Sequence, residues 1–121
     1  MARQKATDEF GRTNLMLAAR YQSKEFVKKA LKFDAMLQGD IFFTDKDGRT
    51  ALFYAAERGD EEIVGILLSS LAGTGILCER GALLEVRDNE GNLAEDWAQI
   101  NGQEEIRRIL SVERQRIEFF E

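Results

Sequence analysis

The sequence predicts an all-α fold, a solenoid of three stacked helix-turn-helix units joined by short β-hairpin-like turns. Two observations predict it. The stretch DKDGRTALFYAAERGDEEIVGILL, residues 45–68, recurs at residues 8–31 and, with more changes, at residues 88–110. Each copy places an aspartate three residues before a glycine and continues with apolar residues at helical spacing. Because one such unit cannot bury its apolar face alone, about three stacked units are the minimum for a continuous core.

Each copy opens with a turn that leads into a short helix. Asp8, Asp45 and Asp88 can accept hydrogen bonds from the backbone just ahead, and the glycine three residues later supplies the positive φ of a tight turn. Thr13 and Thr50 then stand where a helix N-cap hydroxyl is expected, directly before the apolar stretches LMLAA and LFYAA.

A second turn and a longer helix complete each unit. Gly59 and Gly102 are predicted to end the first helix in the left-handed conformation, whereas Gln22 indicates a differently built turn in the first copy. The second helix carries an apolar face in the first two copies: Phe26, Val27, Ala30 and Leu31, then Ile63, Val64, Leu67 and Leu68. One position of the first helix holds large residues expected in the core between units, with binding as the alternative: Leu17, Tyr54 and Trp97.

Two insertions and a tail lie outside these helix pairs. The insertion at 69–80 is expected to extend its helix, break at its glycines and pack a loop back through its apolar half. The last helix is expected to continue into the tail SVERQRIEFFE, residues 111–121, because no helix breaker intervenes. Phe119 and Phe120 then either fold back as a cap or form an exposed anchor for a partner or a second copy of the chain.

The middle copy carries the residues of a known repeat. DGRTALFYAAERGDEEIVGILL resembles an ankyrin repeat, whose usual form is D-x-x-G-x-T-P-L-H-x-A-A-x-x-G-x-x-E-I-V-x-x-L-L. The first copy departs from it at Gln22 and the third at Leu93, and such drift is typical of terminal repeats. The resemblance implies a single ankyrin-repeat domain over residues 1–121, with repeats at about 8–44, 45–87 and 88–110 and a C-terminal helix extension at 111–121.

Composition and charge argue against several classes of function. The net charge of −5 argues against non-specific nucleic-acid binding. No apolar run approaches the roughly 20 residues that cross a membrane. The start MARQKATDEF lacks the apolar core of a secretion signal, and a single cysteine, Cys78, indicates a reducing compartment. We therefore expect a cytoplasmic protein with no membrane or nucleic-acid partner.

No pattern in the sequence indicates an active site, so we predict that the protein is not an enzyme. The chain has no histidine, the commonest general base and zinc ligand. Gly73–Gly75 form only a fragment of a phosphate-binding loop, and Cys78 is interpreted as buried packing. The carboxylates stand at turns and helix starts, where capping explains them. We predict no catalytic residue, no metal site and no cofactor.

The resemblance implies a binding surface on the concave side of the stack. In the family, partner contacts usually come from residues around the turn glycine and from the two residues before the second glycine. In this sequence the corresponding residues are Glu9, Phe10, Arg12, Arg20, Tyr21, Lys46, Asp47, Arg49, Glu57, Arg58, Asn89, Glu90, Asn92, Ile100 and Asn101. The strongest candidates are Tyr21, Arg49 and Arg58, with Phe10 as an apolar anchor, because aromatic and arginine side chains dominate interface energetics. The alternative, that each is only a solvated edge residue, stays open.

These observations predict a non-catalytic protein–protein interaction module, such as an adaptor, a scaffold or an inhibitor, that binds another protein through its concave face. Two alternatives remain open. One is a self-associating structural protein, a homodimer held by Phe119 and Phe120. The other is a microbial effector that acts on a host protein.

Overall fold

The computed structural model of the chain describes residues 9–35, 40–69 and 83–120. In these ranges no strand occurs, and the elements are α1 (Asn14–Tyr21), α2 (Lys24–Ala35), the 3₁₀ helix η1 (Asp40–Phe42), α3 (Ala51–Arg58), α4 (Glu61–Ser69), α6 (Ala94–Ile100) and α7 (Glu104–Phe120). The predicted all-α class is confirmed.

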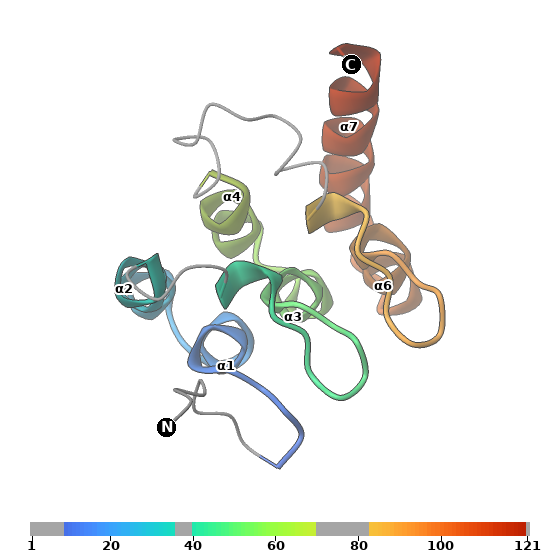
Figure 1. The fold of residues 1–121 in the computed structure, drawn as a ribbon. Helices are drawn as coiled ribbons and strands as arrows, with labels where there is room; N and C mark the ends of the chain where they lie inside the picture. Colours follow the sequence, from blue (N-terminus) through green and yellow to red (C-terminus); the bar gives the residue numbers. More distant parts are fainter. Residues whose placement is uncertain (1–8, 36–39, 70–82, 121) are drawn as a thin grey trace.

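The helices pack in pairs, α1 with α2, α3 with α4, and α6 with α7. The first helices α1, α3 and α6 lie side by side in one row, and the second helices α2, α4 and α7 form another row behind it (Figure 1). The loops that precede α3 and α6 extend to the same side of the first row (Figure 1). This arrangement follows from the repeated sequence, because equivalent apolar residues of successive pairs meet in the same way.

The N-caps of α1 and α3 differ, although the sequence predicts a hydroxyl cap for both. Thr13 Oγ1 accepts a hydrogen bond from the Met16 N–H at 3.2 Å, as predicted. Thr50 occupies the cap position of α3, but its hydroxyl accepts no bond from the helix. The Phe53 N–H, the expected donor, is bound instead to the Thr50 carbonyl oxygen at 3.1 Å. The buried Thr50 Oγ1 consequently has no partner among the described residues, and the predicted hydroxyl cap is absent there.

The first helices end as the glycine pattern predicts, except in the first repeat. Gly59 and Gly102 adopt positive φ angles of 80° and 75°. Gln22 stays extended with a φ of −110°, so the turn after α1 is differently built, as predicted. The Arg58 guanidinium donates to the carbonyl oxygen of Ala19 at 3.3 Å and to that of Gln22. An arginine of the second repeat thus satisfies carbonyl groups at the end of α1.

The core lies between the two rows of helices. Its fully buried residues on the second helices include Val27, Ile63, Val64, Leu67, Ile106 and Leu110. Among the large residues that share one position of the first helices, Tyr54 is buried, whereas Leu17 and Trp97 are only partly buried. The expected inter-repeat packing is therefore complete at Tyr54 and incomplete at the other two.

α7 continues to Phe120, as the absence of a breaker predicts. The backbone of Phe119 and Phe120 belongs to the last turn of this helix, so the segment does not turn back on the stack. The expected glycine break and apolar loop of the second insertion, together with Cys78, lie outside the described residues.

Candidate partner-binding surface

The loops before α3 and α6 are each held by an aspartate, whereas Asp8 of the first repeat lies outside the described residues. Asp45 Oδ1 accepts hydrogen bonds from the N–H groups of Asp47 at 2.8 Å and Arg49 at 3.0 Å. Asp88 makes the equivalent pair of bonds, both of 2.9 Å, in the third repeat. Gly48 supplies a φ of +79° at the tip of the second loop. The turn that the Asp-x-x-Gly pattern predicts is confirmed in both repeats.

Neighbouring loops are joined to one another by backbone hydrogen bonds. The Lys46 N–H donates to the Phe10 carbonyl oxygen at 3.0 Å, and the Asn89 N–H donates to that of Asp47 at 2.9 Å. Asn89 Nδ2 adds a bond of 2.8 Å to the Lys46 carbonyl oxygen. The three loops consequently form one connected row, and their side chains keep a fixed spacing.

A cavity of about 210 Å³ lies between this row of loops and the first helices. We call it the concave groove, and the residues that line it are Phe10, Arg12, Arg20, Tyr21, Asp47, Arg49, Phe53, Tyr54, Glu57 and Trp97. Most of these belong to the surface that the resemblance implies. The three others, Phe53, Tyr54 and Trp97, supply aromatic surface. The sequence assigned Tyr54 and Trp97 to the core between units and made no assignment for Phe53.

Arg49 of the groove is bonded to two carboxylates of the third repeat. Its Nε lies 3.2 Å from Asp88 Oδ2, and its Nη2 lies 3.2 Å from Glu90 Oε1. The guanidinium also stacks over the Trp97 ring, 3.9 Å from the ring centre. Burial alone would raise the pKa of the fully buried Asp88 carboxyl, but hydrogen bonds from the Asn92 N–H and the Arg49 guanidinium outweigh burial and lower it. The Asp88 carboxyl is therefore ionised at neutral pH, facing the Arg49 guanidinium.

Glu57 connects the first and third repeats across the groove. It forms an ion pair with Arg20, and its Oε1 accepts a hydrogen bond from Trp97 Nε1 at 3.2 Å. Its backbone carbonyl accepts another from Gln103 Nε2 at 3.1 Å. Glu57, which lies in the second repeat, is therefore bonded to groups of both the first and the third repeat.

Tyr54 lies deeper in the groove. Its hydroxyl donates to Asp45 Oδ2, and burial, together with the Asp45 carboxylate, raises the pKa of the phenol far above its usual value. Tyr54 stays neutral at physiological pH and anchors the second loop to α3.

The predicted binding residues fall into groups with different surroundings. Phe10 and Tyr21 present 55% and 60% of their surface to solvent, and Lys46, Asp47, Asn89 and Glu90 are exposed on the loops. Asn92 is half-buried behind its loop. Ile100 and Asn101 are exposed at the end of α6 and do not line the groove. Arg58, which the sequence singled out as a contact residue, is bound to the backbone of α1.

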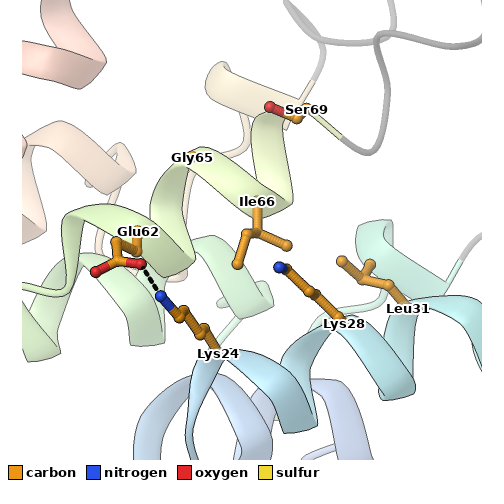
Figure 2. A pocket seen from close by; sticks show the side chains of 7 residues that line it. All are labelled: Lys24, Lys28, Leu31, Glu62, Gly65, Ile66 and Ser69. Atoms are coloured by element: carbon orange, nitrogen blue, oxygen red, sulfur yellow. Dashed lines mark hydrogen bonds and ion pairs between the residues drawn. The ribbon is translucent and has the colours of Figure 1, made fainter.

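A second hollow of about 550 Å³ lies on the opposite row of helices, between α2 and α4. Figure 2 shows the Lys24–Glu62 ion pair at one end, Lys28 and Ile66 in the middle, and Ser69 at the far end. Gly65 leaves space on the α4 side, since a Cβ there would meet no atom within 4 Å. No pattern within one repeat predicts this hollow, because its residues come from two repeats.

Two further properties bear on the class of protein. Within the described ranges, no group of three or more histidine, cysteine, aspartate or glutamate side chains could hold a metal ion. In the same part of the chain, no helix is both long enough and apolar enough to cross a bilayer.

The paired helices, the row of linked loops and the groove between them define a helical repeat protein with a binding face. Comparison with known families agrees with this class: the profile described as "Ankyrin repeats (3 copies)" matches residues 15–119. The chain belongs to the ankyrin-repeat family. Ankyrin repeats are in general protein–protein interaction modules, and the family is typically non-catalytic. No curated protein matches the chain.

Proposed function

We propose that this protein is a non-catalytic adaptor, scaffold or inhibitor whose concave groove binds a partner protein. In this proposal, residues 1–121 form one solenoid domain that acts in the cytoplasm. The observation that carries the proposal is the groove itself, where exposed aromatic side chains stand above a bonded floor of arginine and tryptophan. Such a floor is rigid before any partner arrives, so little conformational entropy is lost on binding.

Within this proposal the groove residues divide into contacts and supports. Phe10 and Tyr21 are the contact residues, because both are exposed and aromatic anchors dominate interface energetics. Arg49 and Glu57 are supports, since their polar groups are already bonded within the chain. Arg20 is likewise a support, since it is paired with Glu57, and the Arg12 guanidinium lies 4.9 Å from the centre of the Phe10 ring.

The proposal is tested by replacing Phe10 and Tyr21 with serine. The partner is first captured from the native organism with the wild-type protein, or from host cells if the protein is an effector, and its affinity is then measured by calorimetry. The double variant is expected to bind at least about tenfold more weakly, because truncating a hot spot costs about 2 kcal/mol or more. Trp97, the single tryptophan, gives a second signal, since partner binding is expected to change its fluorescence.

Val112→Ser is the matched control for this test. Val112 is as exposed as the contact residues but lies on α7, away from the groove. It is expected to bind the partner like the wild type. Equal affinity of the wild type and the Phe10 and Tyr21 variant would refute the assignment of the binding site.

Self-association through Phe119 and Phe120 is the second candidate function. One observation favours it: α7 is the longest of the described helices and ends on this aromatic pair. Deleting residues 117–121 tests it by light scattering after gel filtration. A fall from an oligomeric to a monomeric mass would support a role of the tail, and an unchanged mass refutes it.

A further inference from the structure

Equivalent residues of the three repeats differ in burial in a way that marks one end of the stack as open. The position fifteen residues after the turn glycine holds Phe26, Ile63 and Ile106. Ile63 and Ile106 are 0% and 1% exposed, whereas Phe26 is 53% exposed. Since α4 and α7 each lie behind a preceding helix and α2 has no such neighbour in the described part of the chain, this position is the one that a preceding pair covers.

Other positions repeat this difference. Three residues after the turn glycine, Asn14 is exposed, whereas its equivalents Ala51 and Ala94 are buried. Nineteen residues after it, Ala30 is only partly buried, whereas its equivalents Leu67 and Leu110 are fully buried. We call the uncovered surface of the first pair the N-terminal face. A hollow of about 530 Å³ lies in it, lined by Asn14, Leu17, Ala18, Gln22, Phe26, Lys29 and Ala30.

The opposite end of the stack is closed by charged side chains. Four, five and sixteen residues after the turn glycine, the first two repeats bury apolar residues: Leu15, Met16 and Val27, then Leu52, Phe53 and Val64. The third repeat has Glu95, Asp96 and Arg107 there, all partly exposed. Glu95 is paired with Arg114, and Arg107 with Glu104. Head-to-tail stacking of two copies would bury these charges, so it is unfavourable.

The N-terminal face is complementary to itself. Glu25 and Lys29 stand one helical turn apart on α2, on either side of Phe26, and all three are exposed. Lys29 Nζ lies 6.0 Å from the centre of the Phe26 ring. If a second α2 crosses in the antiparallel direction, Glu25 of each copy meets Lys29 of the other. The two Phe26 rings then meet near the two-fold axis. An interface of this kind is the isologous contact of two-fold dimers.

We propose that the N-terminal face binds a second copy of this chain, forming a two-fold dimer in which the two α2 helices lie antiparallel. The second copy covers the positions that a preceding helix pair covers in the second and third repeats. It leaves the concave groove uncovered, so the dimer presents two partner-binding grooves.

The first test is the mass of the protein in solution. Sedimentation velocity over a range of micromolar concentrations is expected to show a dimer of the 13.8 kDa chain. Phe26→Glu is expected to give a monomer, because it places two carboxylates near the axis. Val112→Glu is the matched control: Val112 is also 53% exposed, and this variant is expected to remain a dimer. Deletion of residues 117–121 separates this dimer from self-association through the tail, because a dimer held by α2 keeps its mass and one held by Phe119 and Phe120 does not.

The second test reverses the charges that the proposal brings together. Glu25→Lys and Lys29→Glu are each expected to weaken the dimer about tenfold at low salt, because the two-fold axis doubles the effect of each change. The double variant restores both pairs and is expected to dimerise like the wild type. Added salt should reduce these differences, since the pairs lie at the surface.

Three results would overturn the proposal: a wild-type protein that stays monomeric at hundreds of micromolar, a Phe26→Glu variant that remains dimeric, or a double charge reversal that does not restore the dimer. Circular dichroism spectra confirm that each variant is folded. Binding to the concave groove does not enter any of these measurements, so the dimer and the partner site can fail independently.

Discussion

Replacing Arg49 with alanine is expected to lower the free energy of unfolding by about 3 kcal/mol, because the change removes one member of a buried ion pair. Arg49 neutralises the carboxylate of Asp88, whose side chain is 0% exposed. Without the guanidinium, that charge stays buried with only backbone N–H groups to stabilise it. The alanine variant also uncovers the Trp97 ring, so its fluorescence is expected to shift toward that of a more exposed tryptophan.

Asp88→Asn provides the control for this result. In the Asp88→Asn background the charge is gone, and adding Arg49→Ala is expected to cost only about 1 kcal/mol. Urea unfolding followed by circular dichroism measures all four proteins of this double-mutant cycle. If Arg49→Ala costs the same amount in both backgrounds, the ion pair with Asp88 is not the source of the stability.

The second large effect is expected at Gly48, with Gly91 as its matched control. Both glycines have positive φ, 79° and 85°, so alanine at either costs about 1 to 2 kcal/mol of backbone strain. A Cβ at Gly91 would meet no atom within 4 Å, whereas one at Gly48 would lie 2.6 Å from Asn89 Oδ1 and 3.0 Å from the Asn89 backbone nitrogen. Gly48→Ala should therefore displace the third loop and weaken the bonds from Asn89 to Asp47 and Lys46.

Those lost bonds are expected to add about 1 to 3 kcal/mol to the cost of Gly48→Ala relative to Gly91→Ala. Thermal unfolding measures the difference directly, because the two variants share their strain and differ only in the contact between loops. Equal melting temperatures would mean that the row of loops shifts without losing stability. That result would contradict the fixed spacing of the loop side chains.

The sequence predicts the parts of this fold that depend on neighbouring residues. The helix pairs, the aspartate turns of the second and third repeats and the left-handed ends at Gly59 and Gly102 follow from patterns of a few residues, and the structure confirms these predictions. The hydroxyl cap predicted for α3 is wrong, although it is a local feature. The Phe53 N–H can bind either the hydroxyl or the carbonyl oxygen of Thr50, and it binds the carbonyl oxygen. A threonine at the cap position does not say which oxygen the helix uses.

The floor of the groove was harder to predict because its bonds join residues of different repeats. Arg49 reaches Asp88, and Trp97 reaches Glu57, about forty positions away along the chain in each case. Trp97 shares a register with the buried Tyr54, so periodicity alone assigns both to the core. The sequence contains one signal, because the first repeat has Gln22 where the second glycine is usual. The structure shows that Arg58 of the second repeat compensates for this change by binding the carbonyl oxygens of Ala19 and Gln22.

The bonds of Glu57 have a consequence for how the protein melts. Repeat arrays usually couple only adjacent units, so an end unit can fray while the others persist. Here the Glu57 carboxylate of the middle unit binds both Arg20 of the first unit and Trp97 of the third, so losing either end unit frees the carboxylate to move and weakens its bond to the other. The molecule is therefore expected to lose its structure in one concerted transition, without a populated half-melted form.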